Sequence, residues 1–95
     1  MTFPRLIFEY DPSKAASNVK KHGVSFAEAM TVFDDPLAST LPDDQHSLGE
    51  SRFITVGLSS RRRILFVVYT ETTSGIRLIG ARPATAAEVE QYEES

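Results

Sequence analysis

Six arginines gathered in one part of the chain are the residues best suited to chemistry. Residues 51 to 83 hold these six and a single acidic residue, Glu71. The arginines are Arg52, Arg61, Arg62, Arg63, Arg77 and Arg82. A guanidinium presents a rigid fork of N–H donors that fits phosphate oxygens, and it stays charged at any working pH. The cluster favours a site for a nucleic-acid backbone, although arginines at sheet edges also serve solubility and ion pairing alone.

Two histidines offer acid–base chemistry or metal ligands. His46 lies in a polar stretch with Asp43, Asp44 and Glu50, where it could carry a proton beside a carboxylate or simply be solvated. The same side chains, together with His22, could ligate a metal, but their spacing matches no metal framework. The sequence contains no cysteine, no glycine-rich phosphate loop and no nucleophile elbow. We therefore predict neither a metal nor a cofactor.

The composition is typical of a single globular domain covering residues 1–95. Hydrophobic residues make up 41% of the chain and charged residues 24%, which is too apolar for a disordered protein. Ninety-five residues provide room for one core of modest size. No apolar run is long enough to cross a membrane, and the N-terminus lacks the apolar centre of a signal peptide. We expect a cytoplasmic protein that does not associate with membranes.

Two helices are predicted near the N-terminus. Asp11 is a suitable N-cap, Pro12 suits the first helical position, and Gly23 suits the end of the first helix. The helical spacing separates an apolar side from a basic side. These sides consist of Ala15, Val19 and His22, and of Lys14, Ser17 and Lys21, respectively. Residues 25–28 form a capping box that opens the second helix, which the proline after Asp35 ends.

Strands and a short final helix follow from the remaining pattern. β-branched and apolar runs predict strands over residues 6–10, 37–41, 52–58, 63–70 and 76–82. A second capping box, from Thr85 to Glu88, opens a helix with Val89 and Tyr92 turned inward. We predict an α+β fold: an antiparallel sheet of about four strands, an N-terminal helix pair and a short C-terminal helix.

The positions of two arginines depend on a detail of the last strand. Five positions separate Arg77 from Arg82, so strict alternation directs them to opposite faces of the sheet. A β-bulge at Gly80 would bring both to one face, unless Arg82 has already left the ladder.

Three motifs in order along the chain resemble the BrnT toxins of bacterial type II toxin–antitoxin systems. They are N-x-x-K-H-G-V-S-F-x-E-A from Asn18, D-x-x-H-x-x-G-E-x-R from Asp43, and A-R-x-A-T-x-x-E-x-x-x-Y-E from Ala81. The resemblance extends from about Phe8 to Glu94, nearly the whole chain. The chain departs from the family pattern in two places, with Gly80 where serine is frequent and Arg62 where a hairpin glycine is usual.

The resemblance has implications for fold, activity and partners. It implies a RelE/ParE-like fold and a ribonuclease activity that stops translation. It also implies a partner, the BrnA antitoxin, which is a ribbon-helix-helix protein that neutralises the toxin. Contact with operator DNA would then come only through that antitoxin. The partner predictions also include an RNA substrate and a possible homodimer.

For such a ribonuclease, the residues suggest a division of roles. Metal-free cleavage needs the 2′-hydroxyl deprotonated, the added phosphorane charge stabilised and the leaving 5′-oxygen protonated. We predict that Arg82 and Arg63 bind the scissile phosphate, and that His46, oriented by Glu50, is the acid or base. Tyr92 is the alternative, although packing suits it better. The residues predicted to bind the substrate strand are Arg77, Lys21 and Arg52.

Two readings from other classes stay open. In one, the arginines hold nucleic acid by charge alone, which predicts strongly salt-dependent binding that leaves RNA intact. In the other, the arginines meet an acidic protein partner, which predicts no affinity for RNA without that partner. A His46→Ala variant separates these readings from an enzyme, because it should retain binding and lose activity only if the protein is catalytic.

Overall fold

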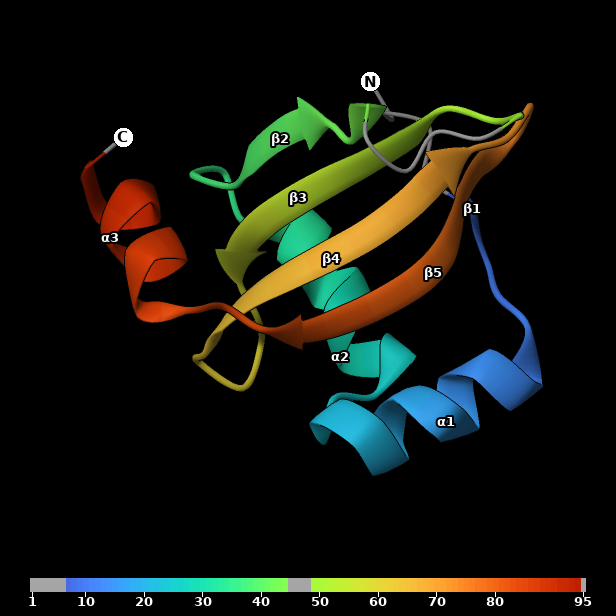
Figure 1. Ribbon diagram of the computed structural model, residues 1–95, viewed down its shortest axis with the longest axis horizontal. Coiled ribbons are helices and arrows are strands. Elements are labelled where there is room, and N and C mark those ends of the chain that lie inside the picture. Colours follow the sequence, from blue (N-terminus) through green and yellow to red (C-terminus); the bar gives the residue numbers. More distant parts are fainter. Residues whose placement is uncertain (1–6, 45–48, 95) are drawn as a thin grey trace, which may run out of the picture.

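The fold is known from a computed structural model that describes residues 7–44 and 49–94. A five-stranded sheet in the order β1-β5-β4-β3-β2 forms its centre (Figure 1). The strands are β1 (Ile7–Glu9), β2 (Ser39–Pro42), β3 (Arg52–Leu58), β4 (Ile64–Glu71) and β5 (Gly75–Pro83). The helices are α1 (Pro12–His22), α2 (Phe26–Thr31), a short 3-10 helix η1 (Val32–Asp34) and α3 (Ala86–Glu94).

The predicted α+β class and order of elements are confirmed, with one correction to the sheet. The described sheet has five strands instead of about four, and it is mixed, because β1 pairs with β5 in parallel. The remaining pairs, β2 with β3, β3 with β4 and β4 with β5, are antiparallel as expected. The parallel pair arises because α1 carries the chain away after β1, and β5 later returns beside β1 in the same direction.

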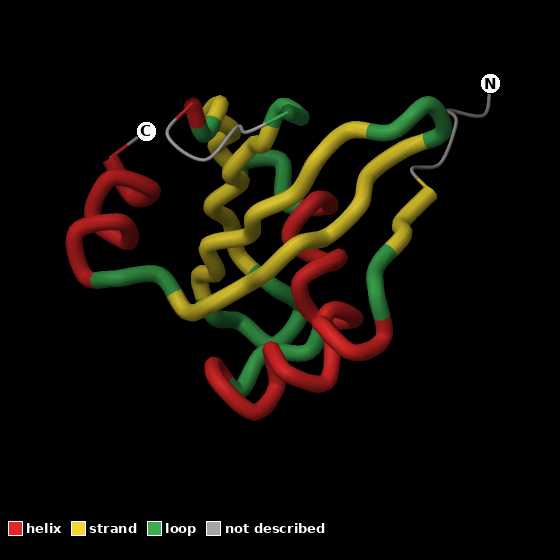
Figure 2. Tube along the Cα trace, turned by 45° about the vertical axis from the view of Figure 1, so that its right-hand side comes forward, coloured by secondary structure: helices red, strands yellow, loops and turns green. Residues whose placement is uncertain are grey.

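The core lies between the sheet and the first two helices. α1 and α2 lie along one face of the sheet, whereas α3 stands at the end of the molecule where β5 leaves the sheet (Figures 1 and 2). Val24, Phe26, Ala29 and Val32 pack there against the sheet residues Leu65, Val67, Tyr69, Ile76, Leu78 and Ala81. The face that α1 and α2 cover is called the inner face below, and the opposite face is called the outer face.

A β-bulge in β5 fixes the direction of its arginines. Tyr69 pairs with Leu78 but Val68 pairs with Gly80, so Ile79 has no opposite residue on β4. Leu78 and Ala81, three positions apart, are consequently both buried in the core. Arg77 and Arg82 therefore share the outer face, and the bulge expected at Gly80 is confirmed.

The inward side of α1 differs from the prediction. Val19 is 49% exposed, whereas Asn18 is 7% exposed. The Asn18 amide donates to the carbonyls of Val24 (2.9 Å) and Ala81 (2.8 Å), and its Oδ1 accepts from the Ala81 N–H (3.1 Å). Asn18 thus occupies the place of a neighbouring strand beyond the end of β1. An apolar residue there would leave buried backbone groups unpaired, which is why the polar residue faces inward.

The two predicted capping boxes behave differently. At α3 the box is complete, because Thr85 Oγ1 accepts from the Glu88 N–H and Glu88 Oε1 accepts from the Thr85 N–H. At α2, Ser25 Oγ accepts from the Glu28 N–H (3.0 Å), but the Glu28 carboxylate binds Arg63 instead of reaching back to the cap. The Glu28 carboxylate is therefore directed toward Arg63 and away from its own helix cap.

Candidate active site

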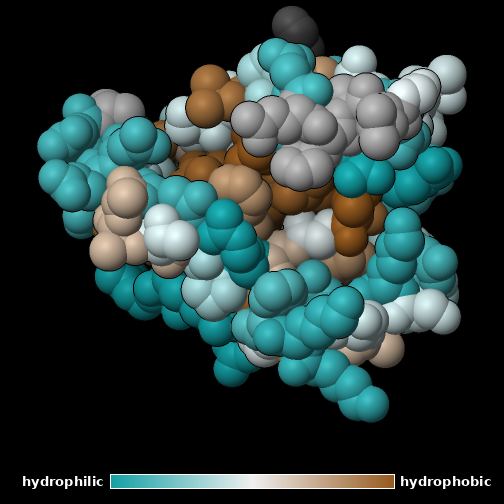
Figure 3. Space-filling view, viewed as in Figure 1, coloured by the Kyte–Doolittle hydropathy of each residue, from teal (hydrophilic) through white to brown (hydrophobic). Residues whose placement is uncertain are grey.

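The outer face of the sheet carries an apolar groove with charged ends. Figure 3 shows apolar surface in a hollow bordered by hydrophilic side chains. The groove has a volume of about 450 Å³. Its described lining is Asp43, Arg52, Ile54, Phe66, Val68, Ile79, Gly80 and Arg82. The arginines within it come from the start of β3 and the end of β5, which the sheet order places on either side of β4.

Arg82 is held in the groove by an aromatic ring and a carboxylate. It pairs with Phe66 across the ladder, and its Cζ lies 3.9 Å from the centre of the Phe66 ring. Its Nη1 donates to Glu88 Oε1 at 2.8 Å, and its Nη2 donates to Glu88 Oε2 at 3.0 Å. Nη1 also donates to the carbonyl of Pro83 at 3.2 Å. These contacts fix the position and the plane of the guanidinium.

The contacts of Arg82 leave one binding edge of the guanidinium unused. A guanidinium has five N–H donors, and the bonds to Glu88 and Pro83 use three of them. The two others, on Nε and Nη2, point along a second edge, and no described residue accepts from them. That edge is a complete fork for two oxygens of a phosphate. Arg82 can thus bind a phosphate without giving up Glu88.

Glu88 is the partner of Arg82 that the sequence reasoning recognised only as a helix cap. The hydrogen bonds from Arg82 hold the pKa of the Glu88 carboxyl below its ordinary range, and the same bonds raise the pKa of Arg82. Both side chains therefore stay charged at neutral pH. The capping box of Thr85 begins three residues after Arg82, and that spacing is the signal from which the pair could have been found.

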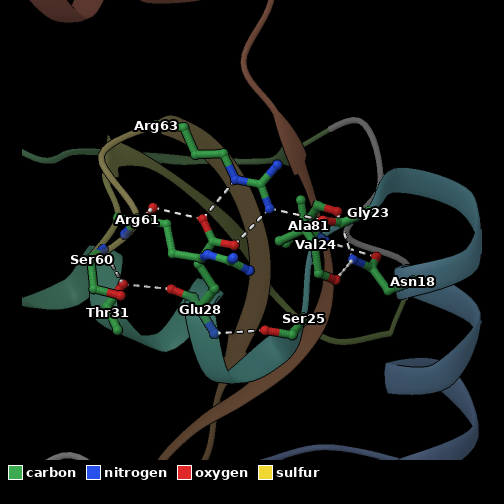
Figure 4. Close-up of polar contacts among 11 residues, drawn as sticks. Asn18, Gly23, Val24, Ser25, Glu28, Thr31, Ser60, Arg61, Arg63 and Ala81 are labelled. Atoms are coloured by element: carbon green, nitrogen blue, oxygen red, sulfur yellow. Dashed lines mark hydrogen bonds and ion pairs between the residues drawn. The ribbon is translucent and has the colours of Figure 1, made fainter.

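Arg63 lies on the inner face, where it points toward Glu28 of α2 (Figure 4). Its Nε and Nη2 donate to the two carboxylate oxygens of Glu28 at 2.8 and 2.6 Å, and Nη2 also donates to the Gly23 carbonyl at 2.8 Å. Ser59 Oγ donates to the same carboxylate at 2.7 Å. These bonds, chiefly the one from Arg63, hold the pKa of Glu28 below its ordinary range. The sheet separates the two arginines that were predicted to share one phosphate.

The other predicted residues do not form one cluster with Arg82 in the part of the chain that the structure describes. Arg52 lines the groove with Arg82. Arg77 is exposed at the edge near β1, with its Nη2 3.5 Å from Glu9 Oε2. Lys21 lines a separate hollow beside α1. Glu50 is exposed. His46 lies outside the described residues, so its pairing with Glu50 stays a prediction.

Tyr92 connects α3 to the end of α2 and η1. Its hydroxyl donates to Asp35 Oδ2 at 2.6 Å, and that oxygen also accepts from the Leu58 N–H. The hydrogen bond to Asp35 raises the pKa of Tyr92 to about 12, which disfavours the phenolate at neutral pH. The contact favours an anchoring role for Tyr92.

The described residues form neither a metal site nor a membrane-spanning helix. Across residues 7–44 and 49–94, no three histidine or acidic side chains are grouped to hold a metal ion. No helix in that part of the chain is long and apolar enough to cross a membrane.

Comparisons with known proteins gave one family match and one solved structure of similar fold. The family described as the ribonuclease toxin BrnT of type II toxin–antitoxin systems matches residues 10–88. The crystal structure of the ribonuclease toxin BrnT from Brucella abortus is similar in fold, with a TM-score of 0.67. At 21% identity, the match covers 85% of this chain and 99% of that chain. A search of curated proteins gave no match.

Proposed function

The chain belongs to the BrnT family of ribonuclease toxins of type II toxin–antitoxin systems, and from this premise we propose that it cleaves RNA without a metal ion and stops translation. Membership in such a system implies an antitoxin partner. The observation that supports catalysis best is the open fork of Arg82, held by Glu88 on the Phe66 ring inside the groove.

The groove suits a single-stranded RNA backbone with its bases splayed. The Nε and Nη2 edge of Arg82 would hold two oxygens of the scissile phosphate, and Arg52 would supply a second positive charge in the same groove. The apolar floor of Ile54 and Val68 would receive a base or ribose, which stack on or pack against apolar side chains in many single-strand sites. Arg77 and Lys21 would steer the flanking backbone.

The proposed cleavage transfers only protons and the phosphoryl group, so it needs no cofactor. The 2′-oxygen forms a bond to phosphorus as its proton passes to a general base. The bond from phosphorus to the 5′-oxygen breaks, and a general acid protonates that oxygen. The products are a 2′,3′-cyclic phosphate and a 5′-hydroxyl end. Arg82 would stabilise the charge that accumulates on the phosphorane, and His46, with Glu50, would carry the proton.

The contacts of Arg63 favour a role in holding the fold over a direct role in the reaction. Both of its donor groups that face the carboxylate of Glu28 are engaged, and Glu28 joins α2 to the hairpin that precedes β4. By fixing that hairpin, Arg63 would set the start of β4 and thereby the register of Phe66 with Arg82.

The proposed partner is a BrnA-like ribbon-helix-helix antitoxin. It would neutralise the toxin in the cytoplasm, and contact with operator DNA would pass through the antitoxin alone. The net charge of −3 agrees with this, because the chain as a whole has no excess of positive charge for binding duplex DNA directly.

The experiment that tests the proposed function is cleavage of a defined RNA by purified protein in excess EDTA. We expect fragments with 2′,3′-cyclic phosphate and 5′-hydroxyl ends. An RNA of the same sequence with 2′-deoxy nucleotides should remain whole, because the attacking oxygen is missing. Cleavage of the deoxy substrate, or loss of cleavage on chelation, would contradict the mechanism.

Glu88→Gln is expected to slow cleavage about tenfold to a hundredfold with little change in KM, because Arg82 would keep its charge and lose its fixed orientation. Single-turnover and steady-state rates measure this effect. Glu90→Gln is the matched control, since Glu90 is exposed on the same helix and should cleave like the wild type. A Glu88→Gln protein with wild-type kcat would contradict an orienting role.

The same variant predicts a pH effect on stability. The pKa of Glu88 is lowered from 4.5 in the folded protein, so its pairing with Arg82 stabilises the fold fully above pH 4.5. That contribution is lost as the pH falls through the lowered value. With the Glu88 side chain 21% exposed and the Arg82 side chain 34% exposed, we expect no more than about 1 kcal/mol. Urea unfolding of wild type and Glu88→Gln should therefore differ at pH 7 and converge in acid.

A further inference from the structure

A basic hollow lies between α1 and β5, beside the groove but separate from it. It has a volume of about 320 Å³. The lining consists of Lys14, Ser17, Asn18, Lys21 and His22 from α1, with Ile79 and Gly80 from the bulge of β5. α1 contains three lysines, one histidine and no acidic residue. We call this hollow the α1 subsite.

The α1 subsite adjoins the groove on the outer face. Ile79 and Gly80 line both, so the bulge of β5 is the boundary that the two hollows share. Lys14, Lys21 and His22 line the hollow on one side of this boundary, and Arg82 lines the groove on the other. A chain bound at Arg82 that continued across Gly80 would meet them.

Neither the backbone conformation nor close packing requires a glycine at position 80. Its φ lies outside the positive region that favours glycine, and a Cβ built there would meet only Asn18 Oδ1, at 3.7 Å. Because Gly80 has no side chain, no side-chain atoms of this residue stand between the two hollows. A glycine at this position therefore suits a strand of substrate that crosses β5.

We propose that the α1 subsite binds a backbone phosphate of the same RNA strand that Arg82 holds, on the far side of Gly80 from the cleaved bond. This proposal rests on the proposed function and extends it to the path of the substrate. Lys14 and Lys21 would supply the charge and Ser17 a hydroxyl donor. Asn18 takes no part, because its amide is engaged with Ala81 and Val24.

If the RNA strand runs from the groove into the α1 subsite, its affinity should depend on its length. A short RNA would fill the groove alone, whereas a longer RNA would also reach the α1 subsite. Each phosphate neutralised on a single strand adds about 0.7 to the slope of log affinity against log salt concentration. The longer RNA should therefore bind more tightly, and its binding should depend more steeply on salt.

The test compares non-cleavable 2′-O-methyl RNAs of about four and about ten nucleotides by fluorescence anisotropy. Lys14→Glu should weaken binding of the longer RNA about tenfold and reduce its salt slope by about 0.7, so that the longer RNA no longer binds more tightly than the short one. Lys20→Glu is the matched control, because Lys20 makes the same charge change on α1 but does not line the subsite. It should retain the gain from length.

The outcomes separate this proposal from the proposed function. Equal losses of affinity for the longer RNA with Lys14→Glu and Lys20→Glu would overturn the subsite, because the effect would then come from the charge of α1 as a whole. So would a gain from length that Lys14→Glu leaves unchanged, or no gain from length in the wild type. Cleavage of unmodified RNA by the wild type is measured in parallel. A Lys14-specific loss without any cleavage would support the subsite and contradict the ribonuclease.

Discussion

Arg82→Ala is expected to slow RNA cleavage by about a hundredfold to a thousandfold while the fold is retained. The substitution removes a donor fork that faces the groove, and loss of a comparable oxyanion donor costs that much in other enzymes. The side chain is 34% exposed and its contacts are one ring and one partly exposed carboxylate, so we expect only about 1 kcal/mol of lost stability. Single-turnover cleavage of a defined RNA measures the rate.

Two further variants make the Arg82 result specific. Arg82→Lys keeps the charge but loses the fork, so it should recover only a small part of the rate. Arg61→Ala removes an exposed arginine of the β3–β4 hairpin and should cleave like the wild type. If circular dichroism showed that Arg82→Ala is unfolded, Arg82 would be a structural residue and its assignment to the phosphate would fail.

Arg63→Ala is expected to cost about 3 kcal/mol of unfolding free energy. Glu28 is 4% exposed, and without Arg63 its charged carboxylate would remain buried with Ser59 as its described partner. Removing one partner of a buried pair costs about 3–5 kcal/mol, and the 37% exposure of the Arg63 side chain favours the lower end. For a chain of this size, the loss corresponds to a fall in Tm of roughly 12–24 °C.

A second substitution identifies the cause of that loss. If the unpaired charge of Glu28 destabilises Arg63→Ala, then Glu28→Gln in the same protein should restore part of the stability, because a neutral amide is less costly to bury. Thermal unfolding of the two single variants and the double variant measures the coupling. An Arg63→Ala protein with wild-type Tm and no cleavage would instead show that Arg63 acts in the reaction.

The sequence was sufficient to predict the order of elements. Pro12, Gly23 and Thr85 carry local signals, and helix caps depend on residues a few positions apart. Alternation along the last strand can also be read from the chain, and it left two alternatives for Arg82, a bulge at Gly80 or a position outside the ladder; the structure has the bulge. Arg62 has a φ of 65° at the position where the family pattern usually has a hairpin glycine.

Pairing between distant residues could not be predicted from the sequence. Glu28 reads as a capping residue, but Arg63 lies 35 positions later and takes its carboxylate. Asn18 reads as a polar break in an apolar helix face, and only the position of Ala81 explains its burial. Which arginine faces the groove depends on strand register, and register is set by packing that local spacing does not encode.

The most direct test of the account is the length of a defined messenger in a cell-free translation reaction, read on a denaturing gel. The reaction is run with wild-type protein and with Arg82→Ala. We predict shortened messenger with the wild type and intact messenger with the variant. Full-length messenger in both reactions would contradict RNA cleavage as the basis of toxicity, and equal shortening in both would contradict the role of Arg82.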